Sequence, residues 1–230
     1  MKIKDSVIII TGASGGIGLA AARELAKRGA RVVLAARSRD KIAALEKELP
    51  GSLAIPTDMR TPEEVRRLID ETKRKFCRID VLINNAGQGL RASVGDIDMN
   101  EYRSIMELNV FAALEAMQAV IPVMREQGGG MILNISSLVS KYYFPSLAAY
   151  ASTKYALNAL TLTAREELAR EHIVVSAFHP KMTATEFGAN ALGTPYSSAA
   201  GRPGMNADAA EEVAAKIAGQ IESEEAEVQM

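Results

Sequence analysis

The stretch Thr11-Gly12-Ala13-Ser14-Gly15-Gly16-Ile17-Gly18 decides how this chain of 230 residues folds. It follows the apolar run Val7–Ile10 and opens a helical pattern over Gly16–Arg28, so it joins a buried strand to a helix. Glycines at such a junction permit a tight turn, and the bare N–H groups of the helix N-terminus can then face a pyrophosphate. A glycine-rich turn without a ligand is the alternative, but the position after the first strand favours dinucleotide binding. The candidate cofactor contacts here are Gly12, Ser14, Gly15, Gly16, Ile17 and Gly18.

Outward from this turn, short apolar runs alternate with helical patterns over the whole chain. The runs are rich in Val, Ile and Leu, which is typical of strands buried on both faces of a parallel sheet. They are Val7–Ile10, Val32–Ala35, Leu53–Pro56, Val81–Asn84, Met131–Ile135 and Ile173–Phe178, with Ala226–Met230 as a short seventh candidate. The helical patterns are Gly16–Arg28, Arg39–Leu49, Thr61–Phe76, Met99–Glu126, Tyr150–Glu171 and Ala207–Gln220. This alternation predicts an α/β fold, namely one Rossmann domain over residues 1–230 with a doubly wound parallel sheet of six to seven strands flanked by helices.

Composition narrows the classes of function. The chain carries 27 Lys and Arg against 28 Asp and Glu, a net charge of −1, whereas nucleic-acid binding needs a surplus of basic residues. Cys77 is the only cysteine and there are two histidines, so we expect no intrachain disulfide and no cysteine- or histidine-rich metal site. The most apolar stretch, Asn109–Met124, contains a glutamate and a proline and is shorter than the roughly 20 residues of a membrane span. We therefore expect a cytoplasmic protein with no nucleic-acid or membrane partner and no metal.

Several further motifs occur in a fixed order. Asn84-Asn85-Ala86-Gly87 follows the fourth apolar run, Asn109 lies in the long helical pattern, and Ser137 follows the fifth run. Tyr150-Ala-Ser-Thr-Lys154 opens the next helix. Together with the T-G-x-x-x-G-x-G spacing of the first turn, these motifs resemble the short-chain dehydrogenase/reductase family over essentially the whole chain from Ser6 onward. The resemblance implies an oxidoreductase that uses a nicotinamide dinucleotide.

The end of the second strand, Leu34-Ala35-Ala36-Arg37-Ser38-Arg39, bears on which dinucleotide is bound. An NAD site places a carboxylate here to hydrogen-bond the ribose hydroxyls, but this chain has Ala36 followed by Arg37. A guanidinium can hold a 2′-phosphate with two hydrogen bonds, so Arg37, helped by Arg39, favours NADP(H) over NAD(H). A solvated arginine at the start of a helix is the alternative. By resemblance, the other cofactor contacts are Asp58, Met59, Asn85, Ala86, Gly87, Tyr150, Lys154, Pro180, Thr183 and Thr185.

Tyr150 and Lys154 carry the expected chemistry. At i and i+4 their side chains leave one face of a helix, although such a pair is also common on an ordinary helix surface. A tyrosine near pH 7 needs a cationic neighbour to exchange its proton, because its reference pKa is about 10. Ser137 would hold the reacting oxygen; Ser136 has the same chemistry, and only the family spacing to Tyr150 selects Ser137. By resemblance Asn109 is the fourth catalytic residue. Without the resemblance, we would interpret Asn109 as an ordinary polar residue of the helix.

The long irregular stretch Pro180–Asn206 predicts a substrate lid over about 181–206. Two residues depart from the family pattern: Lys181 stands where the family has Gly, and Ser140 where it often has Gly. Lys181 puts the local backbone in question and would add positive charge near the pocket. We interpret His179 as a strand-end residue and not a base. Apolar side chains that would face a roomy substrate pocket, or belong to the core, are Leu138, Tyr142, Tyr143, Phe144, Phe187, Leu192, Tyr196 and Met205.

The sequence therefore predicts an NADP(H)-dependent oxidoreductase that moves a hydride between the nicotinamide and a carbonyl or secondary alcohol of a small to medium apolar molecule. A 3-oxoacyl-thioester (acyl-carrier) reductase is the alternative enzyme, thinly supported by Lys141 and Lys181 as basic residues for the carrier. A dinucleotide-binding sensor or scaffold without turnover is the alternative of another class, but it has no need of Ser137, Tyr150 and Lys154 together. By resemblance we expect a homodimer or homotetramer through the helices Met99–Glu126 and Tyr150–Glu171.

Overall fold

A seven-stranded parallel sheet forms the centre of the computed structural model, which describes residues 1–194 and 207–230. The strand order is β3-β2-β1-β4-β6-β7-β9, so the chain reverses direction between β1 and β4. The strands are β1 (Val7–Thr11), β2 (Arg31–Ala36), β3 (Leu53–Pro56), β4 (Val81–Asn84), β6 (Gly130–Ile135), β7 (Ile173–His179) and β9 (Glu227–Gln229). The predicted doubly wound α/β fold is confirmed, including the short seventh strand. Ligands of such sheets bind outside the carboxyl ends of the strands at the reversal point, where the glycine turn lies.

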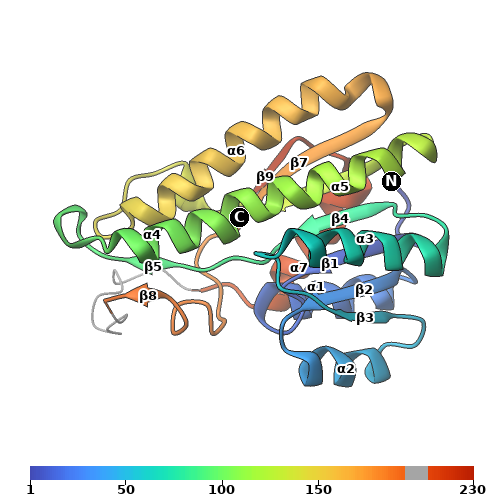
Figure 1. Cartoon of the computed structure of the whole chain (residues 1–230), viewed down its shortest axis with the longest axis horizontal. Helices are drawn as coiled ribbons and strands as arrows, with labels where there is room; N and C mark the ends of the chain where they lie inside the picture. The colour runs from blue at the N-terminus through green and yellow to red at the C-terminus, as the bar shows by residue number, and fades with distance from the viewer. Residues whose placement is uncertain (195–206) are drawn as a thin grey trace.

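Helices cover both faces of the sheet (Figure 1). Alternate residues of each central strand face opposite cores: Ile8 and Ile10 face one, Val7 and Ile9 the other. The first core is completed by α1 (Gly16–Lys27), α2 (Arg39–Glu48) and α7 (Ala210–Ser223). The second is completed by α3 (Pro62–Phe76), α5 (Ala112–Glu126) and α6 (Ala148–Leu168). Because each strand is buried on both faces, the strands appear in the sequence as unbroken apolar runs.

The helix expected over Met99–Glu126 forms, with a change of pitch in its middle. Its parts are α4 (Met99–Met106), a π-helical segment over Glu107–Phe111, and α5. These 28 residues are together long and apolar enough to span a membrane. The stretch Asn109–Met124, which we considered in the sequence, is too short for that. Core helices pass that same test, and α5 buries one face against the sheet. Asn109 lies inside the π-helical segment, a feature common at functional sites.

The region around the predicted lid contains structure that the sequence did not suggest. A second small sheet pairs β5 (Leu90–Arg91) with β8 (Leu192–Gly193), so the first part of the lid is tied to the loop after β4. The helix α7 begins three residues later than expected, after Ala209. The predicted pocket residues Tyr196 and Met205, and the lid over 195–206, lie outside the described residues.

Candidate active site

Close backbone packing fixes the glycine turn between β1 and α1. A Cβ on Gly18 would lie 2.4 Å from the Gly12 carbonyl oxygen and 2.5 Å from Asn85 Nδ2, so no side chain fits there. Gly12 has φ +70°, a left-handed conformation that favours glycine. At Gly15 the same construction meets nothing within 4 Å. The turn is therefore packed tightly on its inner side and open at Gly15, where the N–H groups that begin α1 are exposed to a ligand.

Thr11 braces this turn against the end of β4. Its Oγ1 accepts hydrogen bonds from the N–H groups of Asn85 and Ala86, both at 3.0 Å. In return Asn85 Nδ2 donates to the Thr11 carbonyl at 2.9 Å. We did not single out Thr11 from the sequence, although a threonine at the end of a strand directly before the first glycine is a usable signal. The predicted residues Asn85, Ala86 and Gly87 thus lie beside the glycine turn.

The ends of β2 and β3 lie on the same edge of the sheet. Arg37 and Arg39 are exposed, and within the described residues neither guanidinium has a hydrogen bond or an ion pair. Asp58 follows β3 in a tight turn: its N–H donates to Glu64 Oε2 at 2.7 Å, and its Oδ1 accepts from the N–H of Arg60 at 3.0 Å. Met59 beside it is buried. The structure places these predicted residues at the same edge of the sheet as the glycine turn, and both guanidinium groups are without a partner among the described residues.

Tyr150 and Lys154 lie in the first two turns of α6, and both side chains are buried. Lys154 Nζ donates to the Ile135 carbonyl at 2.9 Å and lies 5.9 Å from the centre of the Tyr150 ring. Burial lowers the pKa of Lys154 to about 8, so the ammonium keeps its charge at neutral pH. Burial also raises the pKa of Tyr150 well above its ordinary value, against the smaller lowering effect of a hydrogen bond with Ser137. In the protein alone, the phenol therefore holds its proton at neutral pH.

Ser137 stands directly after β6 and faces Tyr150. Its hydroxyl is near enough to the Tyr150 hydroxyl to lower the pKa of the phenol, and its Oγ accepts from the N–H of Val139 at 3.3 Å. Ser136, the other serine considered, is buried, and its Oγ lies 3.3 Å from Ser140 Oγ. The geometry thus distinguishes the two serines: Ser137 reaches the tyrosine, whereas Ser136 packs inside.

Asn109 bridges the loop after β4 to α6. Its Oδ1 accepts from the N–H of Gln88 at 2.8 Å, and its Nδ2 donates to the Gln88 carbonyl at 2.9 Å and to Thr153 Oγ1 at 3.1 Å. Thr153 in turn donates to the Tyr150 carbonyl at 2.8 Å. Gln88 and Thr153 were missed from the sequence, Gln88 because its backbone and not its side chain makes the contact. Asn109 therefore holds the loop that carries Gly87 at a set distance from the tyrosine helix.

Comparisons with known proteins identify the family of this chain. The family model described as short chain dehydrogenase matches residues 6–194. The chain belongs to the short-chain dehydrogenase family. An uncharacterised oxidoreductase of Staphylococcus saprophyticus is 36% identical over 189 residues, which are 80% of this chain and 77% of that protein.

Two solved structures extend the comparison to the whole fold. A 3-ketoacyl-(acyl-carrier-protein) reductase from Brucella melitensis, complexed with NADH, superposes with a TM-score of 0.90 at 25% identity and covers 99% of this chain and 98% of its own. An alcohol dehydrogenase from Thermococcus sibiricus, complexed with 5-hydroxy-NADP, has a TM-score of 0.86 at 26% identity, covering 99% and 96%. Two different reactions are thus named among proteins of this shape, so the fold alone does not choose the substrate.

The start of the lid in this dehydrogenase lies against both the glycine turn and the tyrosine. The Thr185 side chain lies 3.3 Å from the place a Cβ of Gly16 would take, and the Phe187 ring packs on Tyr150 with centroids 5.6 Å apart. The Pro180 carbonyl accepts from the N–H of Leu138 at 3.0 Å, and Thr183 forms an isolated bridge with Asp208. The predicted Pro180, Thr183 and Thr185 thus lie along the same edge as Ser137 and Tyr150.

Lys181 does not behave as its replacement of glycine suggested. It is absent from the described residues with positive φ, so lysine is accommodated there without left-handed strain. Its Nζ forms an ion pair with Asp208 Oδ1 at 2.9 Å. The expected free positive charge beside the pocket is therefore balanced by a carboxylate.

Proposed function

We propose that this short-chain dehydrogenase is an NADP(H)-dependent oxidoreductase that transfers a hydride between the nicotinamide and a carbonyl or secondary alcohol of a small to medium apolar molecule. One observation carries the proposal. A buried phenol beside a serine hydroxyl, with an ammonium one helical turn away, lies on the same sheet edge as an open glycine turn. A proton donor and a dinucleotide cradle are the two parts that such a reaction requires.

The cradle fits a dinucleotide pyrophosphate. Gly12 and Gly18 leave no room for a side chain on the inner side, while Gly15 is open at one end of a groove of about 570 Å³ that continues along α1, α2 and the start of α7. The N-terminus of α1 adds bare N–H groups and a favourable dipole for an anion. The unpaired guanidinium of Arg37, with Arg39 two residues on, would hold a 2′-phosphate, and the Thermococcus alcohol dehydrogenase was solved with an NADP derivative. These features support NADP(H), although the Brucella reductase was solved with NADH.

The bound nicotinamide would supply or accept the hydride, and the chain supplies the proton. For reduction, Tyr150 holds its proton at neutral pH and gives it to the carbonyl oxygen, which Ser137 also hydrogen-bonds. The phenolate left behind needs positive charge nearby, because burial alone disfavours it. Lys154 provides that charge, and its single hydrogen bond to Ile135 leaves two of its three N–H donors available in the described protein.

Aromatic and apolar side chains around Tyr150 favour an apolar substrate. The Phe187 ring, tilted 52° to the Tyr150 ring, covers one side of the phenol. Tyr142 and Tyr143 are exposed on the loop between Ser137 and α6. Of these three rings, Phe187 is the one that packs against the phenol, where it would exclude water from a reacting carbonyl.

The 3-oxoacyl-thioester reductase is the second candidate, because the Brucella protein of the same shape has that activity in its name. The two lysines that supported this reductase in the sequence are both paired with a carboxylate in the structure. Lys141 pairs with Glu227 at 2.6 Å and Lys181 with Asp208 at 2.9 Å. A basic patch for an acidic carrier would need these charges free. The sensor without turnover has no use for a phenol, a serine and an ammonium brought together.

One assay separates the three. NADPH consumption is followed at 340 nm over ketones, aldehydes, quinones and acetoacetyl thioesters, with NADH in parallel. The proposed function predicts turnover of apolar ketones or aldehydes that is lost in Tyr150→Phe, while dinucleotide binding persists. Turnover of acetoacetyl thioesters alone would favour the acyl reductase. Tight NADPH binding with no turnover of any compound would favour the sensor.

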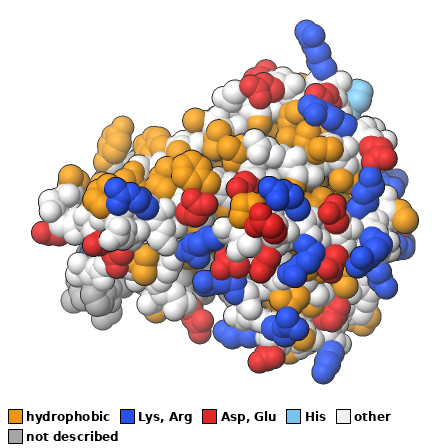
Figure 2. Space-filling view, viewed as in Figure 1, with side chains coloured by type: hydrophobic (Ala, Val, Ile, Leu, Met, Phe, Trp, Pro, Cys, Tyr) orange, Lys and Arg blue, Asp and Glu red, His pale blue; other side chains and the backbone are white. Residues whose placement is uncertain are grey.

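The outer face formed by α4, the π-helical segment, α5 and α6 is our proposed surface for a homodimer or homotetramer. Figure 2 shows hydrophobic side chains gathered along α5 and α6, whereas charged side chains dominate over α2 and α3. Phe111 is 48% exposed there, and Tyr143 stacks on Tyr155 with centroids 6.4 Å apart. Exposed aromatics on one face are typical of an interface.

We keep a cytoplasmic location in the proposal because the one thiol, Cys77, is exposed and unpaired, as suits a reducing compartment.

A further inference from the structure

A chain of hydrogen-bonded polar side chains runs from the C-terminal strand β9 to the loop that carries Ser137. Glu227 Oε1 lies 2.6 Å from Lys141 Nζ and 2.9 Å from His179 Nε2. His179 Nδ1 lies 3.3 Å from Ser140 Oγ, and this hydroxyl donates to the Ser137 carbonyl at 2.6 Å. His179 is fully buried and Ser140 nearly so. A polar chain whose inner members are buried and hydrogen-bonded fixes local geometry strongly.

Ser140 is the hub of this chain. Its Oγ also accepts from Asn158 Nδ2 at 2.8 Å, and Asn158 lies on α6, the helix that carries Tyr150. One hydroxyl therefore ties together the tyrosine helix, the end of β7 at His179 and the Ser137 loop. The family often has glycine at this position, which can make none of these contacts.

The Ser137 carbonyl is held by two hydrogen bonds from one residue. The Ser140 hydroxyl donates to it at 2.6 Å and the Ser140 N–H donates at 3.0 Å. Fixing this carbonyl fixes the peptide plane of Ser137 and so limits where its side chain lies. That side chain is the one beside the Tyr150 hydroxyl, whose pKa it lowers.

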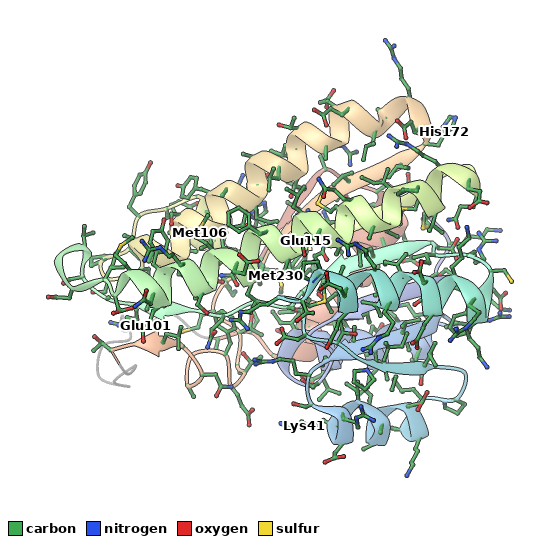
Figure 3. The ribbon with its side chains drawn as sticks, viewed as in Figure 1. Lys41, Glu101, Met106, Glu115, His172 and Met230 are labelled. Atoms are coloured by element: carbon green, nitrogen blue, oxygen red, sulfur yellow. The ribbon has the colours of Figure 1, made fainter. Side chains whose placement is uncertain are left out.

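We propose that Ser140 and His179 are positioning residues, which hold Ser137 in place against Tyr150, and that Glu227 fixes His179 from the C-terminal strand. The inference rests on the proposed hydride transfer, and neither residue touches the reacting atoms. Figures 1 and 3 show the C-terminus at Met230 in the middle of the view, where its N–H donates to the His179 carbonyl at 3.3 Å. The last strand of the chain is thereby coupled to the reaction centre.

The kinetic test compares four variants with the wild-type protein, using NADPH and the best carbonyl of the panel. Ser140→Ala and His179→Phe break the chain; His179→Asn keeps an amide close to the place of Nδ1. Thr72→Val is the matched control, because Thr72 is a buried hydroxyl bonded to Leu68 on α3, away from the site. We expect kcat to fall about tenfold or more in Ser140→Ala and His179→Phe with little change in the KM for NADPH, since misplacement by 1 Å costs roughly 10²-fold. His179→Asn should recover most of kcat, and Thr72→Val should keep it.

Crystal structures of the wild type and Ser140→Ala with NADPH give a second measurement, namely the distance from Ser137 Oγ to the Tyr150 hydroxyl. The proposal predicts that this distance lengthens in the variant. It is overturned if folded Ser140→Ala and His179→Phe keep their kcat, if the KM for NADPH rises as much as kcat falls, or if Ser137 does not move. If the wild type reduces no carbonyl, the proposed function fails, and the movement of Ser137 alone then decides the positioning role.

Discussion

Burial acts on the two titratable groups of the site in opposite directions. It lowers the pKa of Lys154 to about 8 and raises that of Tyr150, so each group moves toward its neutral form. Moving a phenol from its ordinary pKa of about 10 to near 7 takes roughly 4 kcal/mol of preferential stabilisation of the phenolate. The hydrogen bond from Ser137 supplies part of this, and the ammonium of Lys154 must supply more. The site is therefore set for a phenol that starts protonated, which suits reduction of a carbonyl.

The buried ammonium of Lys154 predicts how the free energy of unfolding depends on pH. Between pH 8 and about 10, the unfolded chain keeps the proton on Lys154 while the folded chain releases it, so stability rises with pH in this window. We expect the free energy of unfolding to increase by about 2–3 kcal/mol relative to Lys154→Met, which lacks this slope. Urea unfolding of both proteins without cofactor at several pH values measures it. Parallel curves would contradict the lowered pKa.

The free guanidinium of Arg37 predicts a change in cofactor preference. In Arg37→Asp, a carboxylate would repel the 2′-phosphate and could accept hydrogen bonds from ribose hydroxyls. We expect the Kd for NADPH to rise by about 10²-fold, as for the loss of a charge-assisted bidentate contact, while NADH binds as well or better. Fluorescence titration with both dinucleotides measures this. Equal losses for both would show that Arg37 does not bind the 2′-phosphate.

At the scale of elements, the active edge is built from the ends of parallel strands and the beginnings of the next helices. The glycine turn after β1 and the Asn85 loop after β4 meet because the chain reverses direction between these two strands. The π-helical segment between α4 and α5 places Asn109 against the Gln88 backbone, and α6 brings Tyr150 to the end of β6. Figure 3 shows His172 at the turn between α6 and β7, so His179 lies at the opposite, active end of that strand.

The packing of the glycine turn predicts a sharp contrast between two alanine variants. In Gly18→Ala the new Cβ would lie 2.4 Å from the Gly12 carbonyl oxygen, so the β1–α1 junction must open. We expect a loss of about 1–3 kcal/mol of stability together with loss of dinucleotide binding. Gly15→Ala, with φ −174° and open space around its Cβ, should change stability by less than about 0.5 kcal/mol. Equal destabilisation in urea unfolding would contradict this account of the turn.

At the scale of the whole molecule, charge and apolar surface are distributed unevenly. Ion pairs such as Arg23 with Glu48 and Lys73 with Glu126 lie on exposed helices and are worth little individually. The face over α5 and α6 instead carries hydrophobic side chains (Figure 2).

The small β5–β8 sheet ties the segment after β7 to the loop after β4, so this segment is anchored at Leu192 and Gly193.

The apolar face predicts an oligomer that a single charge disrupts. Phe111→Glu places a carboxylate in the middle of the proposed interface, where its desolvation is unfavourable. We expect light scattering to give at least two chains for the wild type and a smaller assembly, down to one chain, for the variant. Lys41→Glu is the control, because Figure 3 shows Lys41 on α2, on the other side of the molecule from α5. A wild-type mass of one chain would refute the interface.

The sequence by itself determined the fold class, the glycine turn and the pairing of Tyr150 with Lys154, because strand burial, glycine requirements and helical spacing are local properties. Only the tertiary structure decided which charges are free. Lys141 and Lys181 meet Glu227 and Asp208, partners 86 and 27 residues away, whereas Arg37 meets none among the described residues. The network of Ser140, His179 and Glu227 likewise depends on strand register and loop closure. Such contacts join residues far apart in the chain, so no local pattern encodes them.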